Sequence, residues 1–284
     1  MDKKINYDVN PKEGFYFGIK LIVSIAAYGL LAAFLSMGIN TENSPAITVA
    51  IFYAVIIGIA LIFRMGILVG YLKGNAIKIT DKQFPDIYKI VAKQSEKLGL
   101  RKIPDVYILQ AGGLLNAFAT RFMGRNYVVI YSDILEEAYE NNLESVEFVI
   151  GHELGHIKRK HISKQLILFP SIFIPFLNQA YSRACEYTCD NIGAALSPKG
   201  VLTGLILLSS GKKLYKKVNV ETFAQQNSTE TSFWAWFAEK VSTHPKLTKR
   251  ISRHKNNKAA YVAPVKTEPI IPKYETVDHN QYMP

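Results

Sequence analysis

The first residues that could do chemistry are two histidines and a glutamate in the stretch GHELGH, at positions 151–156. Residues four apart on an α-helix share a face, so His152 and His156 would point the same way, with Glu153 beside them. Two neutral imidazoles at this spacing are typical zinc ligands, and the glutamate can take a proton from a water on the metal. The stretch therefore predicts a helix that holds one Zn²⁺ per chain, with Glu153 as the catalytic base.

The surroundings of this motif indicate a buried helix. Gly151 and Gly155 each cost a helix about 1 kcal/mol relative to alanine, which suggests that another element packs close to the backbone. If the helix continues, His161 lies about 140° away from His156 around the helix axis. We therefore expect His161 to be a partly exposed basic residue outside the cluster.

A second helix, predicted around SRACEYTCD at positions 182–190, carries the remaining candidate ligands. Glu186 can supply a third metal ligand, and Asp190, four residues later on the same face, can accept the free N–H of a liganding histidine. Arg183 lies one turn earlier and could pair with either carboxylate. The alternative is an ordinary amphipathic helix with solvated charges, which the upstream motif makes less attractive.

Two uncharged segments, residues 21–41 and 43–63, each approach the roughly 20 residues that a helix needs to cross a bilayer. Two buried core helices, or a signal peptide in place of the first span, are the alternatives. Lysine and arginine flank the outer ends of the pair, and its short connection has neither, which places both ends in the cytoplasm. These flanking residues are Lys3, Lys4, Lys12 and Lys20 before the pair, and Arg64, Lys73, Lys78 and Lys82 after it.

The composition agrees with a membrane-anchored chain. Hydrophobic residues make up 49% and charged residues 20% of the 284 positions, and the mean hydropathy is +0.06. The net charge of +11 would also suit nucleic acid, but the sequence has no nucleic-acid-binding motif, so we expect no such partner. Cys185 and Cys189 are too few for a disulfide framework and are expected to be reduced.

The remaining segments predict an amphipathic helix at residues 84–98 and three short strands between 102 and 132 that form a small β-meander. Residues 165–180 are apolar but too short for a confident third span, and Pro170 and Pro175 interrupt them. They are expected to be buried or to graze the membrane. The aromatic-rich stretch at 232–241 leaves two interpretations open, a core element or an anchor at the lipid interface.

Four stretches together resemble a known family: GHELGH, SRACEYTCD, STHPKLTKRI at 242–251, and NAFAT at 116–120. Between about Val106 and Ile251 they are similar to the HtpX-like membrane metallopeptidases, a gluzincin family that includes CAAX prenyl protease and mitochondrial stress protease types. Relatives of the HtpX kind often carry further membrane spans after the zinc helix, and tend to have a small residue where this chain has Cys189.

The resemblance implies roles for individual residues. His152, His156 and Glu186 are the implied metal ligands and Glu153 the implied base. His244 would donate to the oxyanion of the tetrahedral intermediate, and Arg250 would be a structural partner near the site. The implied substrate-binding strand contains Asn116, Ala117, Phe118 and Ala119.

The expected architecture is a mainly α fold with a small β-meander, that is an α+β zincin-like domain, plus an N-terminal transmembrane hairpin. The expected divisions are a cytoplasmic segment at 1–14, a two-span hairpin at 15–73, a zinc metallopeptidase domain at 74–255 and a disordered tail at 256–284. The leading hypothesis is a zinc metalloendopeptidase of the cell membrane whose catalytic domain faces the cytoplasm. It would cut unfolded or membrane-proximal polypeptides in protein quality control. A non-catalytic, zinc-stabilised membrane adaptor and a prenyl-protein protease are the alternatives.

Overall fold

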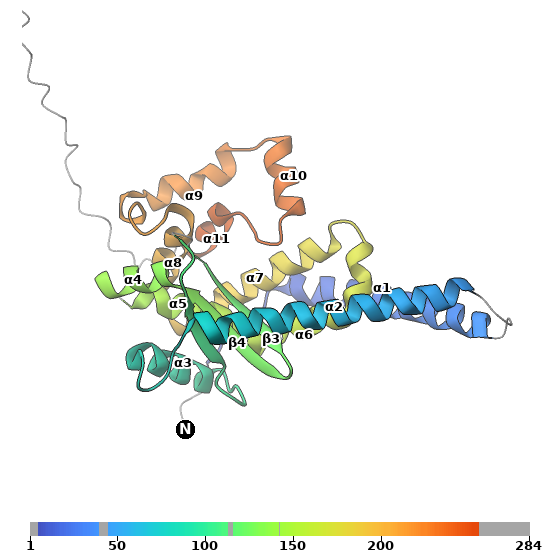
Figure 1. The fold of residues 1–284 in the computed structure, drawn as a ribbon. Helices are drawn as coiled ribbons and strands as arrows, with labels where there is room; N and C mark the ends of the chain where they lie inside the picture. The colour runs from blue at the N-terminus through green and yellow to red at the C-terminus, as the bar shows by residue number, and fades with distance from the viewer. Residues whose placement is uncertain (1–4, 40–44, 113–115, 142, 256–284) are drawn as a thin grey trace, which may run out of the picture.

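A computed structural model of the chain describes residues 5–39, 45–112, 116–141 and 143–255 (Figure 1). The tail expected at 256–284 lies outside these residues. The mainly helical class with a small sheet is confirmed. The α-helices are α1 Pro11–Ile39, α2 Pro45–Asn75, α3 Pro85–Lys97, α4 Ser132–Glu140, α5 Glu144–Lys158, α6 His161–Ile167, α7 Leu177–Leu196, α8 Gly200–Ser210, α9 Val220–Thr229, α10 Phe233–Val241 and α11 Leu247–His254. Two 3₁₀ helices are η1 Phe169–Phe173 and η2 Tyr215–Lys217.

Helices α1 and α2 form a long antiparallel pair that extends away from the rest of the chain (Figure 1). Within the described residues, these two helices are long and apolar enough to cross a membrane. The helices are longer than the expected spans because the start of α1 and the end of α2 continue into the rest of the chain. Val69 and Leu72 of α2 are buried beside the sheet, and the first half of α1 packs against α7.

The sheet has four strands, β1 Ile77–Lys78, β2 Asp105–Leu109, β3 Ala117–Phe122 and β4 Arg125–Tyr131, in the order β1-β2-β4-β3. It is mixed rather than the expected meander, because β2 and β4 are parallel. The chain passes from β2 to the edge of the sheet as β3 and returns through a tight turn, where Met123 and Gly124 both have positive φ. Strand β4 therefore fills the centre, and β3 is left at the edge.

The two faces of the sheet have different neighbours. Val106, Ile108, Val128 and Ile130 belong to the main core, which α3, α5 and α8 complete. The alternate residues of β2 and β4 contribute to the second, smaller cluster against the end of α2. The sheet thus lies between the hairpin and the helix that carries the GHELGH motif.

Candidate metal centre

Close packing of α5 on α7 brings the two candidate ligand helices together. A Cβ atom at Gly151 would lie 3.1 Å from the Cα of Gly193, and one at Gly155 would lie 3.2 Å from the Sγ of Cys189. The expectation that an element packs close to these glycines is confirmed. Both cysteines are free and buried, and Cys189 is part of this contact.

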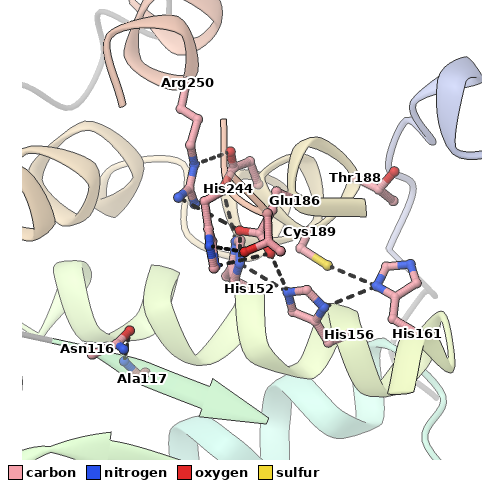
Figure 2. A network of polar contacts seen from close by, with 12 residues as sticks. Asn116, Ala117, His152, His156, His161, Glu186, Thr188, Cys189, His244 and Arg250 are labelled. Atoms are coloured by element: carbon pink, nitrogen blue, oxygen red, sulfur yellow. Dashed lines mark hydrogen bonds and ion pairs between the residues drawn. The ribbon is translucent and has the colours of Figure 1, made fainter. Parts of the chain in front are cut away.

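The three candidate ligands converge on one point (Figure 2). The Nε2 atoms of His152 and His156 are 3.3 Å apart. The Glu186 carboxylate lies 3.4 Å from Nε2 of His152 and 3.3 Å from Nε2 of His156. For a tetrahedral zinc with bonds of about 2.0–2.1 Å, simple geometry puts neighbouring ligand atoms about 3.3–3.4 Å apart. The donor set and its spacing therefore fit Zn²⁺.

The electrostatics of this cluster favour a positive charge. Burial opposes protonation of His152, but hydrogen bonds to Asp190 and Glu186 raise its pKa to about 10. Burial likewise opposes ionisation of Glu186, but hydrogen bonds to the two histidines hold its pKa well below the usual range. A divalent cation bound to the two imidazoles and the Glu186 carboxylate would balance the buried negative charge in the same way as protonated imidazoles do.

Asp190 connects His152 to α11. Its Oδ1 lies 3.0 Å from Nδ1 of His152, so the imidazole keeps Nε2 for a metal when Nδ1 carries the proton. The guanidinium of Arg250 donates to both Asp190 oxygens, at 2.8 and 2.6 Å. Burial raises the pKa of Asp190, but the Arg250 charge and the His152 hydrogen bond outweigh it and hold that pKa below its usual range.

His161 does not lie where the sequence predicted. Helix α5 ends at Lys158, and Lys160 adopts a left-handed conformation with φ 56°, so His161 begins a new helix. Its side chain is buried, with Nδ1 3.2 Å from Nδ1 of His156. Its Nε2 lies 3.2 Å from the carboxylate of Glu13 in α1. The expectation of a partly exposed residue outside the cluster was wrong, because it assumed a continuous helix.

The expectation that Arg183 pairs with Glu186 or Asp190 was also wrong. Its guanidinium donates to the carbonyl oxygens of Glu239, Lys240 and Ser242, at 2.6–2.9 Å. The last carbonyls of a helix have no partner within the helix. Arg183 therefore binds the carboxyl end of α10 to α7 and helps to position the segment that leads to His244.

The remaining candidates lie around the cluster. Nε2 of His244 is 3.7 Å from the Glu186 carboxylate, and its side chain is largely exposed. Glu153 is buried next to His152 on α5. Asn116 immediately precedes the edge strand β3, which contains Ala117, Phe118 and Ala119 and lies beside α5 (Figure 2). Sequence reasoning missed Glu13, because no local pattern links a residue in α1 to a histidine 148 positions later.

The model of peptidase family M48 matches residues 81–174 and 164–258 of this chain. The chain belongs to peptidase family M48. This confirms the resemblance to the HtpX-like metallopeptidases. The matched residues of this M48 chain include α5, α7 and α11, which carry the cluster just described.

Curated relatives of this M48 chain are distant. The plastoglobule-localized metallopeptidase 48 of Arabidopsis thaliana is 23% identical over 60% of the chain, and the chain spans 55% of that protein's length. A "Protease HtpX homolog" of Streptococcus pyogenes is 24% identical, covering 84% of the chain and 95% of the relative. Among solved structures, Ste24p of S. mikatae aligns with a TM-score of 0.45 at 12% identity, covering 87% of this chain and 67% of that one.

Proposed function

We propose that this M48 chain is a membrane-anchored, zinc-dependent endopeptidase whose catalytic domain faces the cytoplasm. The observation that supports it is the mutual spacing of His152, His156 and Glu186, which equals the edge of a tetrahedral zinc site. Unfolded or membrane-proximal polypeptides in protein quality control are the proposed substrates.

Each residue of the site has a separate role in peptide hydrolysis. When bound, zinc would polarise the scissile carbonyl and lower the pKa of a coordinated water. Glu153 removes a proton from the attacking water and later delivers it to the leaving amine. The exposed imidazole of His244 lies close enough to the cluster to donate to the developing oxyanion. Asp190, held by Arg250, accepts the Nδ1–H of His152 and so directs Nε2 toward the metal site.

Strand β3 is the proposed binding site for the substrate backbone. Among the described strands it pairs with β4 alone, so its outer edge can accept an extended polypeptide as an added strand. Such binding uses main-chain hydrogen bonds, so it favours extended, unfolded segments and depends little on their amino-acid sequence.

Two other functions are weaker. A zinc-stabilised adaptor would not need Glu153 next to the ligands. A prenyl-protein protease would need an enclosed chamber in the membrane, for which two spans offer little. Cleavage of a farnesylated peptide, compared with the same peptide without the lipid, separates the last alternative from the proposal.

The Glu153→Gln variant tests the proposal. We expect it to bind one zinc per chain, measured by metal analysis, and to lose chelator-sensitive cleavage of casein. Wild-type cleavage by this variant would refute the role of Glu153, and failure of the wild-type chain to bind zinc would refute the site. Zinc binding without cleavage by the wild-type chain would favour the adaptor.

A further inference from the structure

A continuous apolar segment connects α6 to α7 and faces outward. Residues 166–176 contain no charged side chain. Leu166 is 74% exposed and Phe173 is 77% exposed. The other large exposed hydrophobic residues of this segment are Ile167, Phe169, Ile172, Ile174 and Phe176. An exposed apolar surface of this kind marks a contact with a partner or a membrane.

The position of this segment along α1 identifies the contact. Lys20 Nζ donates to the Asn178 side chain at 2.7 Å, and Tyr28 Oη donates to the carbonyl of Ile167 at 3.1 Å. Tyr28 follows Lys20 by eight residues, so Ile167 lies about 12 Å farther along the α1 axis than Asn178. Figure 1 shows this yellow connection beside the α1–α2 pair, and η1 packs against α1. Exposed apolar residues are present on both the connection and α1.

The backbone of the segment suits a medium without water. Pro170 and Pro175 have no N–H to satisfy. The amides of Ser171 and Leu177 donate to the carbonyls of Leu168 and Ile174, and Ile167 uses its carbonyl to accept the Tyr28 hydroxyl. Irregular backbone at membrane depth requires such internal partners, because lipid supplies none.

We propose that residues 166–176 form a membrane wedge, which enters the acyl chains of the leaflet next to the catalytic domain without crossing the bilayer. The wedge rests on the membrane anchoring in the proposed function, since α1 sets its depth. A depth of about 12 Å beyond Lys20 is less than half of the roughly 30 Å hydrocarbon core. The wedge therefore ends within one leaflet.

Helix α10 contacts the end of the wedge that leads into α7. The rings of Phe176 and Phe237 meet edge to face at 6.2 Å, and Phe233, Trp234 and Trp236 are exposed. Tryptophan is enriched at the headgroup level of membranes. Because α10 leads directly to His244, this lipid contact lies next to the candidate active site and would bring membrane-proximal segments toward it.

Tryptophan fluorescence in vesicles of phosphatidylcholine brominated at defined acyl positions tests the wedge. The two tryptophans of the chain both lie in α10, so replacing them with phenylalanine leaves a dark background in the full-length protein. Into this background we would place a single tryptophan at Phe173 in the wedge, at Phe34 in α1, or at Tyr139 in α4. Bimane attached to Leu166→Cys provides a second wedge probe that does not depend on the Phe173 substitution.

The expected result is a blue-shifted emission at Phe173→Trp that acyl-chain bromines quench, as they should quench the bimane probe. Phe34→Trp should also be quenched, and Tyr139→Trp should not. Quenching at position 34 with none at position 173 or in the bimane probe would overturn the wedge and leave the anchor intact. No quenching at position 34 would overturn the membrane anchoring itself.

Discussion

The imidazole of His161 lies 3.2 Å from the carboxylate of Glu13, which is 148 positions earlier in the chain. The other ring nitrogen of His161 lies 3.2 Å from Nδ1 of His156. A row of polar contacts therefore extends from the first turn of α1 to a candidate zinc ligand. Arg159 completes it by donating to the same Glu13 oxygen at 2.8 Å. The row resembles the contacts of His152 with Asp190 and Arg250, so each histidine of the motif has an outer partner.

The first prediction concerns this outer partner of His156. The His161→Leu variant removes the acceptor for Nδ1–H of His156 and should lower zinc affinity by about 10–100-fold. The measurement is zinc competition against a chromophoric chelator. His161→Asn is the matched control, because its side-chain oxygen can take the place of Nδ1 and should recover most of the affinity. Equal zinc affinity in the wild-type and leucine proteins would show that the row only fills space.

Helix periodicity predicted which candidates share a face, His152 with His156 on one helix and Glu186 with Asp190 on a second. That these two helices pack together depends on long-range contacts, which local spacing does not predict. The position of His161 could not be predicted in this way. It depends on Lys160, a lysine with φ 56°, a conformation unusual for a residue with a side chain. Burial of His161 against Glu13 accompanies this conformation, and no local pattern of residues signals such a long-range contact.

Three of the four strands were predicted, but β1 and the order of the strands were not. Continuous apolar runs identify β2 and β4 as strands, and both are buried on the two faces of the sheet. These runs do not show which strands are neighbours. The prediction for Arg183 was wrong for a related reason. Arg183 is close in sequence to the two carboxylates, but its guanidinium donates to the carbonyls at the end of α10.

The second prediction concerns the buried pair of Arg250 and Asp190. Arg250→Ala leaves an uncompensated buried carboxylate and should cost about 3–5 kcal/mol of stability, read from chemical denaturation of the metal-free protein in detergent. Arg250→Lys keeps the charge without the two-point contact and should lose less. Because the pKa of Asp190 is lowered in the folded state, its stabilising contribution is present above its unfolded pKa of about 3.9 and is lost as the pH falls toward the folded pKa.

A control variant at the half-buried Arg183 of α7 separates this effect from general damage. Arg183→Lys removes contacts with backbone carbonyls but leaves Asp190 paired, so its acid denaturation should follow the wild-type midpoint. An Arg250→Ala protein as stable as wild type would contradict the structural importance of the pair.

The third prediction tests substrate binding at the edge of the sheet. Tyr131 N–H donates to the carbonyl of Asn116, and bonding alternates along an antiparallel pair, so Ala117 and Ala119 direct their backbone groups to the outer edge. Proline is tolerated at an edge strand where its missing N–H faces outward. Ala119→Pro should therefore fold and bind zinc normally but lose most cleavage of casein.

Thr120→Pro is the contrasting variant, because position 120 bonds to β4 in the same alternation. It should destabilise the sheet and lower the thermal midpoint, whereas Ala119→Pro should not. If Ala119→Pro cleaved casein at the wild-type rate, main-chain pairing along β3 would not be part of substrate binding.

The fourth prediction concerns the contact between α5 and α7 that sets the ligand distances. A Cβ at Gly193 would lie 2.9 Å from both the ring and the carbonyl oxygen of Phe148, so Gly193→Ala must push the helices apart. Overpacking of this kind costs about 1–3 kcal/mol, and it should also weaken zinc binding because Glu186 moves with α7.

Gly74 in α2 has no neighbour within 4 Å of an added Cβ, so Gly74→Ala should leave zinc affinity unchanged and slightly raise the thermal midpoint. A loss of stability in Gly193→Ala with unchanged zinc affinity would show that the ligand distances do not depend on this contact.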